Sequence, residues 1–302
     1  MRGEIVSTND SELNSMSMSI DQAFEHYPNI GRERLALLCN ISEHEARIQC
    51  RMHKGKRMDD SFKIGVAIGD IHYPYHNNTV NICKEFVRAN DVDYFLFMGD
   101  QMHFDMISTF NMKKPKLKEG SRLKRDYRGF QRLQNSFLDL LPKTCERYWF
   151  MGNHEMRTYR LVESQPELEG MVEPENCLDL KDWKVVPENN VITLGDMNFI
   201  HGIYWNKYHA TKNVQDYGKQ IFNWHVHTHQ VFTMHSPVDS LPKQGVSIGC
   251  ACDVNPEYMR DKPNSWVNQF LIFYLFDDGS FTYYAPIVLN NRCVIDGKVY
   301  KG

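Results

Sequence analysis

The sequence predicts an α/β (α+β) protein with a small helical region at its N-terminus. Three observations lead to this class. Between residues 62 and 151, short apolar runs alternate with segments of helical periodicity, which is the pattern of strands joined by helices. The second half of the chain holds many short apolar runs separated by turn residues. Residues 20–53 instead show the spacing of apolar side chains on helices.

The N-terminal segment is expected to contain three helices. Ile20, Ala23 and Phe24 have helical spacing, and the first helix should end before Pro28. A second apolar stripe covers 35–39, and Asn40 suits the left-handed residue that often ends a helix. The capping box Ser42-x-x-Glu45 then starts a third helix, and the stretch 52–60 is expected to be a linker. We therefore predict a disordered segment at 1–18, a helical region at 19–58 and one larger domain at 62–302.

The larger domain should begin with three strands separated by two helices. Its expected strands lie at 64–68, 94–98, 148–151, 191–194, 198–200, 221–226, 246–248, 270–276 and 281–286. Its expected helices lie at 80–89 and 121–141. Asp278-Gly279 and Asp296-Gly297 are two-residue turns that favour hairpins.

Composition excludes several protein classes. With 42% hydrophobic and 24% charged residues, the chain is neither disordered throughout nor fibrous. Its longest apolar run, Phe270–Phe276, is far shorter than the roughly 20 residues that span a bilayer, so no membrane partner is expected. The polar N-terminus lacks a signal-peptide core. The eight cysteines are scattered, which favours free thiols and a cytoplasmic location, and nothing in the sequence specifies an oligomeric state.

Polar clusters follow the first three expected strands. They are Gly69-Asp70-Ile71-His72, Gly99-Asp100 and Gly152-Asn153-His154-Glu155. Ligands of open α/β sheets bind outside the carboxyl ends of the strands. We therefore expect these side chains to converge at one rim.

Two histidine clusters follow later strands and should join the same rim. These are His201-Gly202 and the run His225-Val226-His227-Thr228-His229. In an extended segment, residues two apart point to the same side, so His227 and His229 can serve one site. Besides His154, the expected set comprises two carboxylates, one amide and four imidazoles. Imidazole and carboxylate ligands suit first-row metals. Seven such ligands suit two ions that share one carboxylate.

The ordered set resembles the calcineurin-like metallophosphoesterase superfamily, whose pattern is D-x-H, G-D, G-N-H-[DE], H, G-H-x-H. The resemblance covers residues 62 to 286 and implies a sandwich of two mixed β-sheets flanked by helices. It implies that Asp70, His72 and His229 hold one metal, that Asn153, His201 and His227 hold the other, and that Asp100 bridges them. It also implies that His154 is catalytic, acting near the scissile phosphate.

Three features distinguish these motifs within the family. Val226 replaces the Gly before the final H-x-H, and Glu155 is the residue that the Ser/Thr phosphatase branch carries. The segment 99–105 nevertheless lacks the Asp-Arg-Gly of those phosphatases. His76, His103 and His225 match no family ligand, and we expect them to support the ligands or the fold.

The expected chemistry is hydrolysis of a phosphate ester by a hydroxide that bridges two divalent metal ions. Such ions neutralise phosphate oxygens and lower the pKa of water. Mn is the first choice, with Fe, Zn, Co or Ni as alternatives. The substrate is expected to be a nucleotide or nucleic-acid phosphodiester. The alternatives are a phosphomonoesterase acting on a phosphoprotein or small molecule, and a DNA-binding regulator with a vestigial metal site.

Two basic segments raise the question of a nucleic-acid partner, although the net charge is −3. Residues 32–51 resemble a helix-turn-helix, in which the second helix enters the DNA major groove. The other reading is a helical bundle that packs on the enzyme or mediates oligomerisation. Residues 111–132 form either a polyanion funnel or an ordinary solvated helix. The candidate nucleic-acid contacts are Arg47, Arg51, Lys113, Lys114, Lys116, Arg122, Lys124 and Arg125.

Overall fold

The computed structural model describes residues 18–27, 30–56, 61–111, 113, 115–238, 241–256, 259 and 262–302, without the side chains of 51–56, 110 and 117. Apart from Met18, the segment predicted to be disordered lies outside these residues, as do Lys114 and the side chain of Arg51. The chain divides into two compact units. One comprises Met1–Ser61 with Ala89–Asp91, and the other Phe62–Arg88 with Val92–Gly302.

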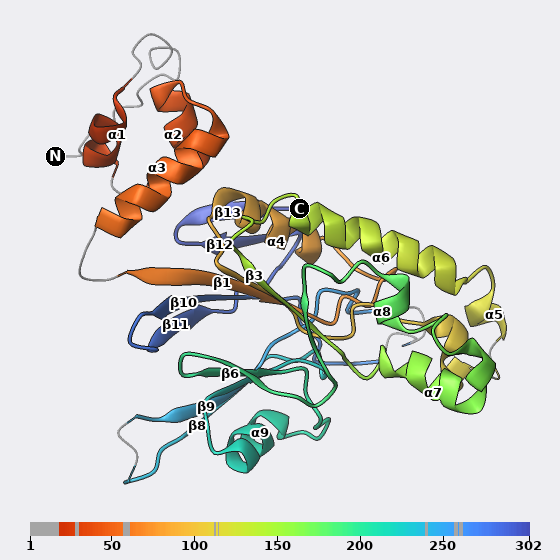
Figure 1. The fold of residues 1–302 in the computed structure, drawn as a ribbon. Helices are drawn as coiled ribbons and strands as arrows, with labels where there is room; N and C mark the ends of the chain where they lie inside the picture. Colours follow the sequence, from red (N-terminus) through yellow and green to blue (C-terminus); the bar gives the residue numbers. More distant parts are fainter. Residues whose placement is uncertain are drawn as a thin grey trace. The chain divides into compact units, whose positions relative to one another are not determined.

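The first unit contains the three expected helices, α1 (Ile20–His26), α2 (Arg32–Cys39) and α3 (Glu43–Lys56) (Figure 1). Asn40 adopts the left-handed conformation, with φ of 50°, and the Ser42 hydroxyl accepts a hydrogen bond from the Glu45 N–H at 3.1 Å. Ala23, Phe24, Leu35, Ala46 and Cys50 form the core between the helices. The expectation of a linker from residue 52 was wrong in part, because α3 continues to Lys56 through residues that are mostly good helix formers.

The second unit begins with a six-stranded mixed sheet. Its order is β11 (Phe281–Tyr284), β10 (Leu271–Phe276), β1 (Phe62–Ile68), β2 (Tyr94–Phe97), β3 (Glu146–Phe150) and β4 (Lys184–Val186). The strands β1 to β4 run parallel, and β10 pairs antiparallel with both β1 and β11. The three-residue strand β4 was not predicted, because its sequence is too short and too exposed to give an apolar run.

A second, five-stranded mixed sheet packs against the first. Its order is β5 (Ile192–Leu194), β6 (Met197–Ile200), β7 (Ile221–Asn223), β9 (Lys243–Ser247) and β8 (Gln230–Met234). The sheets share one core, to which Leu96 and Phe273 contribute from the first sheet and Phe199 and Phe222 from the second. The hairpin of β12 (Arg292–Ile295) and β13 (Lys298–Lys301) stands apart from both sheets. The sandwich of two mixed sheets is thereby confirmed.

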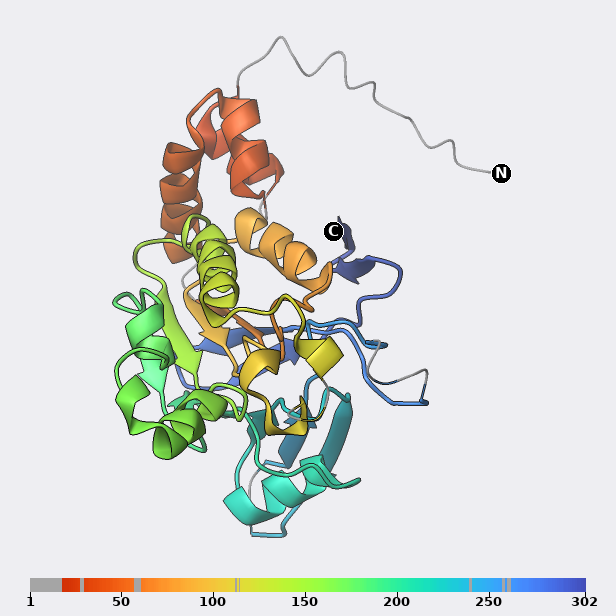
Figure 2. The same cartoon turned by 90° about the vertical axis from the view of Figure 1, so that its right-hand side faces the viewer.

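Helices cover both outer faces of the sandwich. The helices α4 (Thr79–Ala89) and α6 (Leu123–Leu138) lie beside each other over the first sheet in both views, and α9 (His209–Tyr217) covers the second sheet (Figure 2). On α6, Phe137 packs against Phe95 and Phe97 of β2. The shorter helical segments are α5 (Pro115–Lys118), α7 (Met156–Ser164), α8 (Pro174–Cys177) and the 3-10 turns Asp105–Ile107, Thr109–Asn111 and Pro166–Leu168. No helix in the described ranges is both long enough and apolar enough to cross a membrane.

Candidate metal centre

The loops that follow β1, β2 and β3 meet at one edge of the first sheet. The Asp70 N–H donates to the Gly99 carbonyl at 3.0 Å, and the His72 N–H donates to the Asp100 carbonyl at 2.9 Å. In the third loop, the His154 N–H donates to Asp100 Oδ1 at 2.8 Å. These hydrogen bonds fix the backbone of each loop against its neighbour, so the side chains converge at the rim that the strand order predicts.

Two glycines allow this close approach. A Cβ at Gly99 would lie 2.4 Å from the ring of His201, and a Cβ at Gly152 would lie 2.2 Å from Asp100 Oδ1. Gly99 also has φ of 96°, which side chains rarely tolerate. Both positions therefore require glycine for reasons of space.

Asp100 lies at the centre of the resulting cluster. Its carboxylate oxygens lie 3.9 Å from His72 Nε2, 3.8 Å from His154 Nε2 and 3.5 Å from His201 Nε2. The His201 Nε2 atom is in turn 3.3 Å from Asn153 Oδ1. Burial opposes ionisation of Asp100, but the charge of the adjacent His201 holds the pKa of this carboxyl well below its usual value.

The second sheet contributes two further histidines, and they are not the expected pair. His227 Nε2 lies 3.0 Å from His72 Nε2 and 3.7 Å from Asp70 Oδ1. His225 groups with Asp100 and His201, and its N–H donates to Asp70 Oδ2 at 2.8 Å. The structure thus brings together Asp70, His72, Asp100, Asn153, His201 and His227, as the sequence predicts, and adds His225.

His229 does not join this cluster, and His225 lies in the place expected for the second histidine of the H-x-H pair. The side chain of His229 is exposed, immediately before β8. The expectation assumed an extended chain through Val226, but β7 ends at Asn223. His225 and His227 then adopt left-handed backbone conformations, with φ of 79° and 65°, which aim the rings differently from an extended strand.

Five residues of the cluster have a left-handed backbone that side chains normally avoid. They are Asp70, His72, Asp100, His225 and His227, with φ between 47° and 79°. Each such residue lowers the stability of the fold by about 1–2 kcal/mol. Such backbone strain concentrates at functional sites, where the surrounding structure holds it in place.

The chemistry of the cluster fits bound cations. Within the described residues, Asp70 Oδ1 and the Nδ1 atoms of His225 and His227 are buried without a hydrogen-bond partner. Burial and the neighbouring His201 lower the pKa of His225 to about 4, and burial is also the main cause that lowers the pKa of His227 to about 3. Both rings are therefore neutral at pH 7 and have a lone pair for a metal.

Glu155 connects the loop after β2 with the loop after β3 through hydrogen bonds. This fully buried carboxylate accepts hydrogen bonds from the N–H groups of Asp100 at 2.9 Å, Gly152 at 2.9 Å and Met102 at 3.2 Å. Both oxygens are in use, so no neutral side chain of this size can reproduce all three bonds. Glu155 therefore positions Asp100 without touching a substrate.

Glu155→Gln is expected to lower the free energy of unfolding by about 1–3 kcal/mol, because the amide end turns a donor toward a buried N–H. Metal affinity should fall roughly 10- to 100-fold through the displaced Asp100 backbone. Denaturant unfolding and metal titration measure the two effects. Glu163→Gln, an exposed change on α7, is the control and should match the wild type. Equal stability of both variants would contradict the role given to Glu155.

His154 lies beside Arg157, a half-buried arginine that the sequence analysis did not single out. The His154 Nδ1–H donates to the His103 carbonyl at 2.9 Å, so the neutral ring has its lone pair on Nε2. Arg157 donates to this atom through Nη2 at 2.8 Å and to the His103 carbonyl through Nη1 at 2.7 Å. Arg157 was missed because it lies one helical turn after His154, outside the motif.

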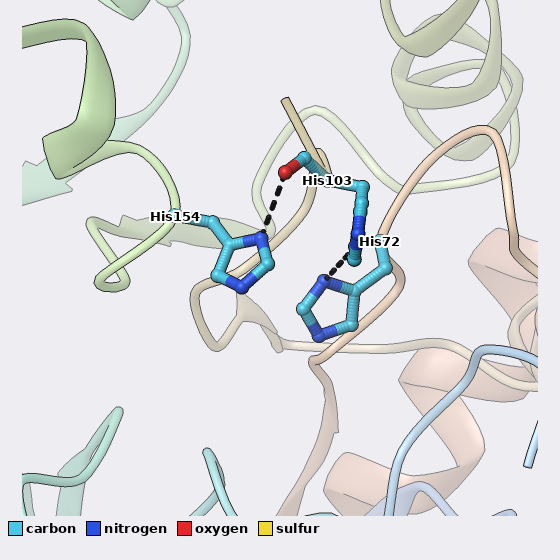
Figure 3. Close-up of side chains that lie close together, drawn as sticks. All are labelled: His72, His103 and His154. Carbon is cyan, nitrogen blue, oxygen red and sulfur yellow. Dashed lines mark hydrogen bonds between the residues drawn. The ribbon is translucent and has the colours of Figure 1, made fainter. Parts of the chain in front are cut away.

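His103 packs against both His72 and His154, whose rings also contact each other (Figure 3). Its Nδ1 lies 3.2 Å from His72 Nδ1, and its Nε2 lies 3.2 Å from Asp105 Oδ1. This arrangement leaves the Nε2 atom of His72 directed at the cluster, and it agrees with the supporting role expected of His103. Cys252 is a further group within reach of His72 and His227.

The candidate nucleic-acid contacts lie outside this centre. Arg122, Lys124 and Arg125 are exposed at the start of α6, and Lys113 and Lys116 are exposed just before it. In the first unit, Arg47 Nε lies 3.5 Å from Asp91. DNA binding by the N-terminal helices stays a prediction, and so does a cytoplasmic location. The eight cysteines are free thiols.

The model of the calcineurin-like phosphoesterase family matches residues 66–271, which is more than half of the chain and contains the whole cluster. The chain belongs to this family. It is therefore a metal-dependent phosphoester hydrolase, with the fold and the class of chemistry that the motifs predict. A comparison with curated protein sequences found no match.

Three solved structures match this chain at low sequence identity. Vps29 from Chaetomium thermophilum has a TM-score of 0.36 at 10% identity, over 79% of this chain and 98% of its own. The nuclease MPE of Pseudomonas putida has a TM-score of 0.31 at 12% identity, over 64% and 76%. A dimetal phosphatase from Danio rerio has a TM-score of 0.37 at 9% identity, over 74% and 95%.

Proposed function

We propose that this phosphoesterase is a two-metal phosphodiesterase or nuclease acting on a nucleotide or nucleic-acid substrate. The observation that carries the proposal is the position of Asp100. Its two oxygens face different histidines, His201 on one side and His72 on the other, which is the arrangement of a carboxylate shared by two cations.

The ligands divide into two sets around Asp100. Asp70, His72 and His227 would hold one ion, since Asp70 Oδ1 and both imidazole Nε2 atoms face one another. Asn153, His201 and His225 would hold the other. Nitrogen and oxygen ligands in this proportion suit Mn, Fe, Zn, Co or Ni, of which Mn is our first choice.

When bound, the ions would supply Lewis acidity toward phosphate oxygens and would lower the pKa of water. The protein's own contribution lies next to them. Arg157 has a permanent positive charge and is held by His154 and the His103 carbonyl. The pKa of His154 is well below its usual value, mainly through burial, so the ring is neutral and accepts the Arg157 hydrogen bond. We assign the pair to binding of a phosphate oxygen, with Arg157 as the charged partner.

Hydrolysis of two chromogenic substrates tests the proposal. With added Mn²⁺, bis-p-nitrophenyl phosphate should be hydrolysed faster than p-nitrophenyl phosphate. Faster hydrolysis of the monoester would replace the diesterase assignment with the phosphomonoesterase alternative. Absence of turnover with either substrate, for each of the five metals, would overturn the proposed function.

Metal binding should also stabilise the fold. At a concentration 100 times Kd, an ion that binds only the folded state adds about 2.7 kcal/mol, which corresponds to a rise in Tm of several degrees. Thermal unfolding with Mn²⁺ and with EDTA measures the difference. The Glu163→Gln variant should show the same rise as the wild type. A Tm that does not respond to any divalent metal would contradict the assignment of the ligands.

A further inference from the structure

The outer face of α6 is a continuous basic surface, which we name the arginine face. It consists of Arg122, Lys124, Arg125, Arg128 and Arg132, all of them exposed. These five side chains alone line a surface hollow of about 520 Å³. The helix lies over the first sheet (Figure 1).

The charges of the arginine face are largely uncompensated. In the described part of the chain, Lys124, Arg128 and Arg132 form no ion pair with a carboxylate. Arg125 Nε lies 3.8 Å from Asp126, and Arg122 donates to the neighbouring Ser121 carbonyl. Like charges three and four residues apart destabilise a helix. An anionic partner would relieve this repulsion along the whole face.

One edge of the arginine face adjoins the loop that carries His72. Gly129 of α6 packs so closely on the Tyr73 ring that an added Cβ would lie 2.1 Å from the Tyr73 hydroxyl. Tyr73 directly follows His72. Arg125 and Arg132, four residues before Gly129 and three after it, are exposed next to that buried contact. The basic surface therefore begins beside the loop that carries His72.

We propose that the arginine face binds the sugar-phosphate backbone of a nucleic acid and holds the substrate strand beside the metal centre. This inference rests on the proposed function and names a polymer as its substrate. From Arg122 to Arg132 the helix rises about 15 Å, at 1.5 Å per residue. With one phosphate per 3.4 Å along each strand, this length covers roughly four nucleotides.

Arginine is the reason to choose nucleic acid over an acidic protein. Four of the five cations are arginines, whose planar guanidinium binds phosphate through two parallel hydrogen bonds. Carboxylates accept the same paired hydrogen bonds, but phosphate esters are the groups on which this family acts. A strand whose phosphodiester lies at the metal centre carries further phosphates that can reach this face.

Binding of a fluorescent single-stranded 20-mer to the full chain in EDTA tests the proposal independently of hydrolysis. The variant Arg122→Gln/Arg125→Gln/Arg128→Gln/Arg132→Gln removes the four arginines. Each lost phosphate contact should reduce the slope of log K against log salt by roughly 0.7, which is about 3 for the four arginines. At 0.1 M salt this corresponds to a loss of affinity of roughly 10²- to 10³-fold.

The control replaces four scattered exposed lysines by glutamine, namely Lys143, Lys181, Lys219 and Lys301. It has the same net charge and should bind within about threefold of the wild type.

Equal losses in the two variants would overturn the proposal, because only the net charge would then matter. Competition by polyglutamate as strong as by an oligonucleotide of equal charge would also overturn it, in favour of an acidic protein. The arginine-face variant should hydrolyse bis-p-nitrophenyl phosphate at the wild-type rate, which shows that it is folded. If the wild type binds the 20-mer through this face but hydrolyses no ester, the proposed function fails while the binding site stands.

Discussion

Replacing Asp100 by alanine should reduce phosphodiester hydrolysis by roughly 10³-fold or more, since one carboxylate faces both sets of metal ligands. The loss should lie mainly in kcat, because Asp100 is directed at the metal ligands and not at the substrate. Initial rates with bis-p-nitrophenyl phosphate and Mn²⁺ measure the effect.

Asp100→Asn separates metal loss from unfolding. The amide keeps the size of the side chain and can still accept the His154 N–H at Oδ1, so the fold should persist while the bridging charge is gone. Metal content by mass spectrometry should fall in both variants. Hydrolysis by Asp100→Ala at the wild-type rate would refute the two-metal centre.

The second large effect is expected at His225, whose replacement by alanine should reduce hydrolysis by about 10²-fold or more. His229→Ala should leave the rate within about twofold, because that side chain is exposed and outside the cluster. Each of the two variants lacks one imidazole of the same short segment. Their ratio of rates therefore reports which histidines act in the H-x-H pair.

The opposite order of effects would restore the assignment made from sequence. If His229→Ala were the damaging change, the segment after β7 would have to be extended in the metal-bound state. His227→Ala is the internal standard, since both assignments place it at a metal, and it should be as damaging as His225→Ala. A harmless His227→Ala would contradict both assignments.

Strand ends were predictable because their signals are local. Apolar runs followed by Gly-Asp or Gly-Asn-His identify where β1, β2 and β3 end, and parallel strands place those ends at one edge. This is why Asp70, Asp100 and Asn153 could be placed together from sequence. The strands that escaped prediction, β4 and β8, are short or exposed and have no apolar periodicity.

The basic segment shows the limit of counting charges. The sequence identified residues 111–132 as basic, but it did not separate the cations that share a surface from those that do not. The structure joins Arg128 and Arg132 to Arg122 and Arg125 because α6 continues through them. Lys113 and Lys116 precede the helix and do not line its hollow.

The sequence by itself determined the family, the metal-dependent class of chemistry and six residues that the structure brings together. Only the tertiary structure decided which histidines of the run 225–229 point inward. The reason is physical, because no local pattern indicates that β7 ends at Asn223. The left-handed turn that follows depends on the bond from the His225 N–H to Asp70, a residue 155 positions earlier. A contact between such distant parts of the chain leaves no trace in the spacing of neighbouring residues.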